Sequence, residues 1–309
     1  MPRRIKGRPI HGWLVLDKPL QMTSTAAVGN VKRLFGAQKA GHAGTLDPLA
    51  TGVLPIAFGE ATKTVSFAMD GEKSYRFSVR WGSETTTDDG EGTVTRTSSS
   101  IPDEEAIHSA LGAFRGLITQ VPPLYSAIKV AGQRSYDLAR DGEDFLLPAR
   151  DVLIKQLDLL DINDAQTATF KAVCGKGTYI RALARDLGRS LGCYGHISSL
   201  RRTQVGPFRD DAAWSFQSLD NLRKEESPIG CSSSSLLPIE AALSGLPNIK
   251  LSSADASRLI RGQSIHIRGV QNARISGQGY ASCDGRLVAL IEGERGEVRP
   301  TRVFNLSAK

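Results

Sequence analysis

Residues 41–52, GHAGTLDPLATG, place a single carboxylate, Asp47, on a loop punctuated by glycines. No other Asp or Glu occurs between Lys18 and Gly59, although several lysines and arginines do. Nearby cations favour the ionised form of a carboxylate, and the proline that follows Asp47 biases it away from helix. The loop is therefore either the site of a functional carboxylate or an ordinary Asp-Pro turn at the surface.

Regular elements are predicted on both sides of this loop. The apolar runs at residues 13–17 and 53–58 are typical of buried strands. Between them the pattern predicts a helix that is capped by Ser24 or Thr25 and ends at Gly36. The Asp47 loop is thus expected to lie between a helix and a buried strand.

Residues 74–81 alternate in polarity and predict a half-buried strand, with Tyr75, Phe77, Val79 and Trp81 on one face. Residues 82–103 are rich in Gly, Ser, Thr and Asp and predict a long exposed loop. A helix is expected over residues 103–114.

Another helix is predicted within GKGTYIRALARDLG, after a strand at residues 167–174. Its apolar stripe leaves Arg181 and Arg185 on another face, and Gly188 is expected to end it. Strands and helices do not alternate regularly along the chain, which favours a mixed α+β domain over a doubly wound parallel sheet.

Residues 225–238 are rich in Ser and Pro and predict a linker or loop. A compact unit follows, with a capped helix at residues 253–261 and several short strands, including RLVALIEG. We therefore expect a catalytic domain over residues 1–244 and a small domain over residues 245–309.

The chain has 309 residues and a formal net charge of +7, which suits a polyanionic partner such as nucleic acid. Its four cysteines lack the spacing of zinc ligands and are expected to be free thiols in a reducing compartment. The basic N-terminus is not followed by the apolar run of a secretory signal, and no segment is long enough to span a membrane. These features predict a cytoplasmic protein, and nothing in them requires more than a monomer.

Several chemistries lack their sequence signature. The chain has no phosphate-binding G-x-x-x-x-G-K-S/T loop, no dinucleotide fingerprint and no nucleophilic serine elbow. Ordinary glycosidases use two carboxylates, but only Asp47 is present in its region. A single carboxylate is compatible with cleavage of a sugar–base bond if the base leaves as a stabilised anion, as uracil does.

Five ordered motifs carry a family likeness. They are GHAGTLDPLATGVLP preceded by LDKP and Thr23-Ser24, then KSY at residues 73–75, VPPLYSAIKVAGQRSYDLAR, GTYIRALARDLG and LRRTQVGPF. Together they closely resemble the TruB family of bacterial tRNA pseudouridine-55 synthases over most of residues 11–210. The tail, with GRLVALIEG and VRPTRVFNL, is similar to the small PUA-type RNA-binding domain of that family.

The resemblance implies isomerisation of a uridine in the T-loop of tRNA to pseudouridine. The C1′–N1 bond breaks, the uracil turns while held, and a C1′–C5 bond forms, without a metal, redox cofactor or nucleotide. It also implies a mixed, largely antiparallel central sheet with flanking helices, a PUA-like β-rich domain, and the T-arm stem-loop of tRNA as partner.

The resemblance also assigns roles to individual residues. Asp47 is implied to be the catalytic carboxylate, which either attacks C1′ or the ring, or abstracts a sugar proton. Arg181 is implied to pair with Asp47, and Tyr75 to stack on the flipped uracil and to act in the late removal of the C5 proton. The residues alone favour core packing for Tyr75 and a solvated helix face for Arg181.

The remaining residues are implied to bind substrate. His42 fills the space of the flipped nucleotide, Leu200 packs against the base, Lys18 braces the site, and Tyr179 belongs to the same set. Expected phosphate contacts are Lys129, Arg201 and Arg202.

The chain departs from the family pattern at Gln21, where glycine is usual, and matches only partly over residues 82–92. Two alternatives stay open: a non-catalytic protein that binds or folds RNA, and an enzyme of the same family acting on another RNA.

Overall fold

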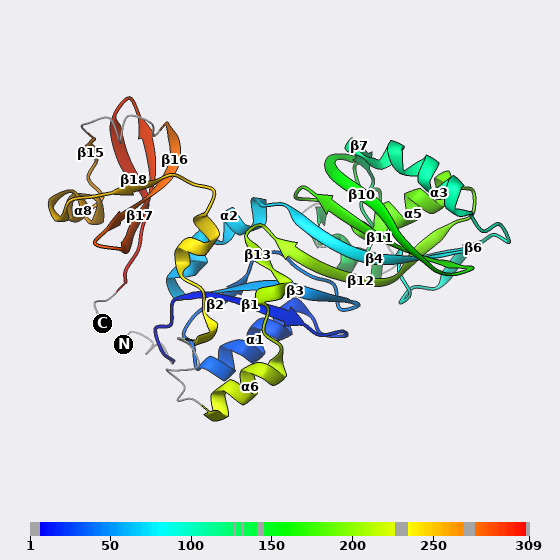
Figure 1. Ribbon diagram of the computed structural model, residues 1–309, viewed down its shortest axis with the longest axis horizontal. Coiled ribbons are helices and arrows are strands. Elements are labelled where there is room, and N and C mark those ends of the chain that lie inside the picture. Colours follow the sequence, from blue (N-terminus) through cyan, green and yellow to red (C-terminus); the bar gives the residue numbers. More distant parts are fainter. Residues whose placement is uncertain are drawn as a thin grey trace.

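The computed structural model describes residues 7–126, 128–130, 133–140, 145–225, 234–267 and 276–306. A nine-stranded sheet runs through the main body, and a smaller five-stranded sheet lies at one end of the molecule (Figure 1). Most of the expected linker falls outside the described residues. No helix in the described ranges is both long and apolar enough to cross a membrane.

The large sheet has one continuous order of strands, with two short strands at its side. The order is β1 (Gly12–Lys18), β3 (Ala50–Phe58), β12 (Gly195–Val205), β4 (Lys73–Trp81), β11 (Thr167–Cys174), β10 (Arg150–Asp164) and β7 (Gly116–Gln120), while β2 (Ala40–His42) pairs with β3 and β13 (Phe208–Arg209) pairs with β12. Only the β3–β12 pair is parallel. The predicted α+β fold with a mixed, largely antiparallel sheet is confirmed.

Helix α1 (Ser24–Phe35) precedes the Asp47 loop and helps to hold it. The expected cap was wrong by one or two residues, because the Thr23 side chain accepts the hydrogen bond from the Ala26 amide at 3.1 Å. Ser24 instead binds the backbone of Leu46, accepting from its N–H at 2.8 Å and donating to its carbonyl at 2.9 Å. The residue directly before Asp47 is thereby fixed to the start of α1.

The prediction of a long exposed loop over residues 82–103 was wrong. Strands β5 (Ser83–Thr85) and β6 (Val94–Thr97) form a hairpin here, and Thr85, Asp88 and Asp89 are buried. The polar composition concealed this because the two aspartates contact arginines that lie far away in the sequence.

Helix α5 (Ile180–Ser190) continues past Gly188. A Cβ on Gly188 would lie 2.4 Å from the Gly195 nitrogen, so this glycine allows α5 to approach β12 closely and does not end the helix. Arg181 and Arg185 lie off the apolar stripe as expected, but their exposed fractions are only 5% and 8%. The solvated helix face considered for Arg181 is therefore excluded.

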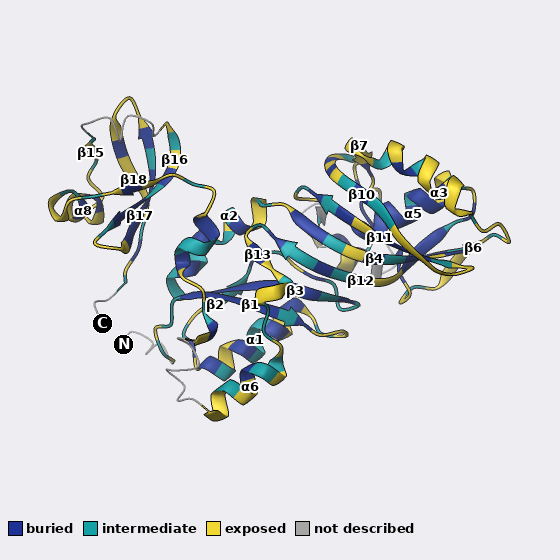
Figure 2. Ribbon diagram, in the orientation of Figure 1, coloured by how far each residue is buried: buried dark blue, intermediate teal, exposed yellow. Residues whose placement is uncertain are grey.

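The small sheet has the order β14 (Asn248–Lys250), β16 (Gly277–Cys283), β17 (Arg286–Glu294), β18 (Glu297–Val303) and β15 (Ile265–His266), with α8 (Ser253–Ile260) beside it. It does not have a wholly separate core. Leu287, Leu290 and Phe304 belong to the same buried apolar cluster as Trp13 and Val15 of β1. Figure 2 shows buried residues in both sheets.

The remaining helices and strands are short. They are the 3-10 helix η1 (Gly59–Thr64), α2 (Val65–Asp70), α3 (Glu104–Leu111), η2 (Gly112–Phe114), β8 (Lys129–Val130), β9 (Gln133–Arg134), α4 (Ser135–Arg140), η3 (Asp210–Ala212), α6 (Phe216–Glu225) and η4 (Ile239–Leu243).

Candidate active site

A cavity of about 350 Å³ lies where the Asp47 loop, β4, β12 and the start of α5 meet. Six of the residues expected in the site line it: Asp47, Tyr75, Tyr179, Arg181, Leu200 and Arg202. Other lining residues include Gly44, Lys73, Ser126 and the GKGT segment, residues 175–178. A volume in this range is typical of pockets for small ligands, so one nucleoside is a reasonable occupant.

Asp47 pairs with Arg181 across this cavity. The Arg181 Nε atom lies 3.0 Å from Asp47 Oδ2, and the exposed fractions of the two side chains are 6% and 36%. The Nε–H group has no aligned hydrogen-bond acceptor among the described residues, so this contact is an ion pair without a well-formed hydrogen bond. The carboxylate is therefore held by charge and still open to a ligand.

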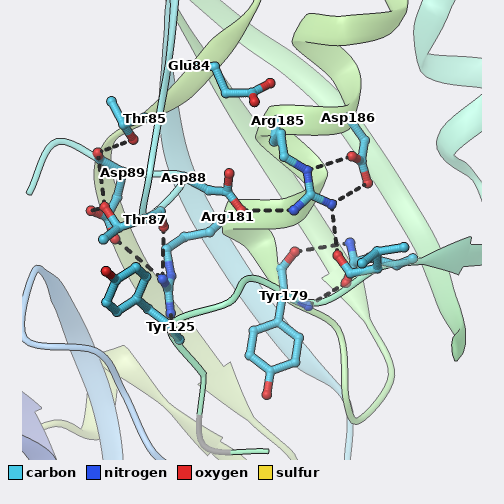
Figure 3. A network of polar contacts seen from close by, with 12 residues as sticks. Glu84, Thr85, Thr87, Asp88, Asp89, Tyr125, Tyr179, Arg181, Arg185 and Asp186 are labelled. Atoms are coloured by element: carbon cyan, nitrogen blue, oxygen red, sulfur yellow. Dashed lines mark hydrogen bonds and ion pairs between the residues drawn. The ribbon is translucent and has the colours of Figure 1, made fainter. Parts of the chain in front are cut away.

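The Arg181 guanidinium is fixed from two other directions (Figure 3). It donates hydrogen bonds of 2.9 Å to the carbonyl oxygens of Thr87 and Tyr125, and its Nη1 lies 3.6 Å from Asp89 Oδ2. Asp89 in turn accepts hydrogen bonds from the Thr87 hydroxyl at 2.5 Å and the Glu91 amide at 3.0 Å. These contacts restrict the orientation of the group that pairs with Asp47.

A second arginine repeats the arrangement one helical turn further along α5. Arg185 donates to Asp88 Oδ2 at 2.9 Å and to the Val121 carbonyl at 2.8 Å, and also pairs with Asp186 (Figure 3). Burial raises the pKa of Asp88 to about 6, although Arg185 opposes the rise.

The sequence analysis missed Asp88, Asp89 and Arg185 as neighbours of the site. A usable signal was present in the spacing of Arg181, Arg185 and Arg189, which places three arginines on one helix face. Three cations on one helix face are stable beside the rest of the fold only if acidic side chains pair with them. The hairpin provides these acids, since Asp89, Asp88 and Glu84 pair with the three arginines in turn.

Tyr75 lies near the start of β4, where the buried face of the strand meets the cavity. The residues that follow on that face, Phe77, Val79 and Trp81, are at most 3% exposed, whereas Tyr75 is partly exposed and lines the cavity. Burial raises the pKa of its hydroxyl, and the charge of Arg202 opposes that rise. Tyr75 therefore presents a neutral aromatic side chain to a ligand at neutral pH.

Leu200 and Tyr179 complete the cavity wall. Leu200 is 7% exposed and stands opposite Phe77 in the β4–β12 register. The Tyr179 backbone is fixed by the Gln120 side chain, which accepts from its N–H at 2.9 Å and donates to its carbonyl at 3.1 Å. These two hydrogen bonds fix the Tyr179 backbone at the N-terminus of α5, where the residue lines the cavity.

Lys18 and His42 lie near the Asp47 loop without lining the cavity. Lys18 is 0% exposed and donates to the carbonyls of Pro19, Met22 and Pro48, at 2.9, 2.7 and 3.4 Å. Burial lowers the pKa of Lys18 to about 8, although Asp47 opposes this. Burial also lowers the pKa of His42, whose Nδ1 has no hydrogen-bond partner among the described residues.

The three residues expected to contact phosphate lie in different surroundings. Arg202 is 2% exposed and donates to the carbonyls of Val53, Thr45 and Gly44, so its position is that of a buried brace. Arg201 points away from the cavity and makes a two-pronged pair with Asp17, at 2.9 and 3.1 Å. Lys129 has its backbone in β8, and its side chain lies outside what the structure describes.

Within the described ranges, no group of three or more His, Cys, Asp or Glu side chains is arranged to hold a metal ion. The three described cysteines, Cys174, Cys193 and Cys283, are free thiols. The charged and polar side chains that line the cavity include two carboxylates, two guanidinium groups, two ammonium groups and two phenols, from Asp47, Asp70, Arg181, Arg202, Lys73, Lys176, Tyr75 and Tyr179.

Comparison with known proteins matches most of the chain to one family. The family model described as TruB family pseudouridylate synthase (N terminal domain) matches residues 32–180, and the tRNA pseudouridylate synthase B C-terminal domain matches residues 181–244. The tRNA pseudouridine synthase B of Nitrobacter winogradskyi is 55% identical over 307 residues, which cover 99% of this chain and 86% of that protein. The corresponding protein of Rhizobium etli is 52% identical over 306 residues, with coverage of 98% and 99%.

Among solved structures, a chain of a Cbf5-Nop10-Gar1 complex superimposes with a TM-score of 0.72 and 26% sequence identity, covering 96% of this chain and 84% of that chain. The family matches span more than half of the chain, and the curated relatives extend over nearly all of it. The chain therefore belongs to the TruB family of pseudouridylate synthases.

Proposed function

We propose that this protein isomerises uridine 55 in the T-loop of tRNA to pseudouridine, with Asp47 as the catalytic carboxylate. Relatives that are named tRNA pseudouridine synthase B and are 50–55% identical support the reaction and its substrate class. The observation that carries the role of Asp47 is its position in the cavity, 3.0 Å from a buried arginine and in a wall shared with Tyr75.

The cavity is suited to a nucleotide that has left its helix. Extruding a stacked base costs a few kcal/mol, and stacking on an aromatic side chain returns about 1–3 kcal/mol. In our proposal Tyr75 supplies that stacking surface, Leu200 packs against the base, and Tyr179 completes the binding wall. Asp47 then reaches the sugar, while Arg181 keeps the carboxylate oriented.

The parts of the molecule outside the cavity fit an RNA substrate. We propose that residues 245–309 form a PUA-like RNA-binding domain that docks on the catalytic domain of residues 1–244. His42 would enter the space left by the flipped nucleotide, and Lys18 would hold the turn beside the Asp47 loop. The protein is proposed to act as a monomer in the cytoplasm, with the T-arm stem-loop as its partner.

The test is conversion of uridine in a T-arm stem-loop, measured by chemical or mass-spectrometric mapping of pseudouridine. Asp47→Asn is expected to abolish conversion while RNA affinity stays within a few-fold, because the amide keeps the shape but cannot serve as nucleophile or base. Asp158→Asn, which changes an exposed carboxylate paired with Arg115, is the matched control and should be fully active. Turnover by the Asp47 variant would remove this residue from the mechanism.

A further inference from the structure

Three arginines are buried in the described part of the chain, and one of them differs from the other two. Arg181 and Arg185 each contact carboxylates. Arg202, at 2% exposure, has no carboxylate oxygen within 4.0 Å of its nitrogens among the described residues, and it donates hydrogen bonds to backbone carbonyls. A buried cation without a counter-charge is unfavourable, because burial removes the solvation of the charge.

This unpaired charge lies at the reaction cavity. Arg202 lines the cavity together with Asp47, Tyr75 and Leu200. The hydrogen bonds to Val53, Thr45 and Gly44 use three of the five N–H groups of a guanidinium, and the side chain also interacts with the Tyr75 hydroxyl in the cavity wall, so its remaining N–H groups face the cavity.

The positive charge of Arg202 also affects the titratable groups around it. The charge of Arg202 contributes to the lowered pKa values of His42 and Lys73, and it opposes the rise in the pKa of Tyr75. These three groups approach Arg202 from β2 and β4, so its field extends across the cavity wall.

The proposed reaction generates a negative charge in the cavity, which is the counter-charge that Arg202 lacks. When the C1′–N1 bond breaks, its electron pair stays on the base, and uracil becomes an anion delocalised over N1, O2 and O4. In one route an Asp47 oxygen bonds to C1′, and in the other C2′ loses a proton to Asp47 and a C1′–C2′ double bond forms. When C5 then bonds to C1′, the base supplies the electron pair, and either the C1′–Asp47 bond breaks or the proton returns from Asp47 to C2′. Loss of the C5 proton and gain of a proton at N1 complete a neutral isomer.

We infer that Arg202 is an electrostatic catalyst that stabilises the detached uracil anion, in place of the phosphate contact expected from the sequence. The inference rests on the proposed function. A fixed cation in a desolvated site stabilises charge that develops in the transition state without having to reorganise, and loss of such a group typically slows a reaction 10²–10³-fold. The three carbonyl contacts keep the guanidinium in place before the substrate arrives.

The test compares uridine with 5-fluorouridine at the target position of a T-arm stem-loop, under single-turnover conditions with saturating enzyme. The fluorine withdraws electrons and makes the base anion more stable by itself. Arg202→Gln is expected to slow consumption of uridine at least 100-fold, with RNA affinity within a few-fold, and to slow consumption of 5-fluorouridine about tenfold or less. Arg202→Lys keeps the charge and should recover part of the lost rate.

Arg76→Gln is the matched control, because Arg76 is an exposed cation on the opposite face of β4 from Tyr75. It should react with both substrates at the wild-type rate. An equal loss of rate for the two bases would assign Arg202 to bracing the loop only, and weaker RNA binding at an unchanged rate would assign it to a phosphate. Either outcome overturns the inference.

Two further outcomes are distinguishable from these. If Arg202→Gln does not fold, the comparison of the two bases is made with Arg202→Lys, and an identical loss of rate for both bases again contradicts the inference. Inactivity of the wild-type protein on uridine would instead refute the proposed function.

Discussion

Gln21 adopts a backbone conformation that glycine tolerates and other residues rarely adopt. Its φ is 61°, and its amide donates to the Pro48 carbonyl at 2.8 Å, so the turn is tied directly to the residue after Asp47. A non-glycine residue in this left-handed region costs about 1–2 kcal/mol. The departure from the usual glycine noted in the sequence therefore leaves the turn intact but strained.

Gln21→Gly is expected to raise the free energy of unfolding by about 0.5–1 kcal/mol, since relief of strain is partly offset by the greater entropy of glycine in the unfolded chain. Chemical denaturation measures the change. Gln217→Gly, within helix α6, is the contrasting control and should destabilise the protein by a similar amount. A loss of stability in both variants would show that the Gln21 side chain makes a stabilising contribution larger than the strain.

Lys18 makes a pH-dependent contribution of a definite sign. Its pKa falls from 10.5 to about 8 in the folded protein, so between these values the unfolded chain binds more protons than the folded one. Stability should therefore rise with pH in this window, with a slope of at most about 1.4 kcal/mol per pH unit. Lys18→Met removes the titration, and the difference in unfolding free energy between the two proteins should change between pH 8 and 10.5. A constant difference would contradict the lowered pKa.

At the scale of elements, local patterns predicted most of the regular structure. Alternation located β4, and a terminal glycine located the end of α1, because both signals depend only on neighbours in the sequence. The β5–β6 hairpin was missed because its aspartates look like loop residues until α5 supplies their arginines. The burial of Arg202 was not predictable for the same reason, since it depends on the parallel β3–β12 pairing.

The contact between the hairpin and α5 leads to a prediction about Asp88. Its pKa is raised to about 6, so below that pH the folded state binds more protons than the unfolded chain, and stability falls as pH rises from about 4 to 6. The ionised carboxylate is therefore unfavourable in the fold at pH 7. Asp88→Asn removes this titration, so the difference in the free energy of unfolding between the variant and the wild type, measured by chemical denaturation, should change between about pH 4 and pH 6.

Asp88→Asn should also lower the single-turnover rate of pseudouridine formation. The ionised Asp88 carboxylate is unfavourable for folding, and such a cost fits a role in holding α5 and the hairpin beside Asp47. Glu84 lies in the same hairpin and pairs with Arg189. Glu84→Gln therefore tests whether any loss of charge in the hairpin lowers the rate. A stability difference between Asp88→Asn and the wild type that stays constant from pH 4 to pH 6 would contradict the raised pKa of Asp88.

At the scale of the whole molecule, the small sheet is attached to the catalytic body through polar and apolar contacts. Lys63 of η1 donates to the Val303 carbonyl at 2.7 Å, and the Asn305 amide donates to Glu60 at 2.6 Å. Phe304, which is 5% exposed, lies beneath the Lys63 ammonium and joins the shared apolar cluster. The orientation of the proposed RNA-binding domain thus depends on contacts that are concentrated at η1 and at the residues directly after β18.

Phe304→Ala is therefore expected to loosen the small sheet without altering the cavity. Removal of a buried phenylalanine side chain typically costs 3–5 kcal/mol, which here falls on the docking of the two parts. RNA affinity should fall at least tenfold, while the single-turnover rate at saturating RNA stays within a few-fold of wild type. Ile260→Ala removes an exposed apolar side chain from α8 and should change neither quantity. A fall in the saturated rate alone would mean that the small sheet shapes the Asp47 site, and the division of labour between the two parts would have to be abandoned.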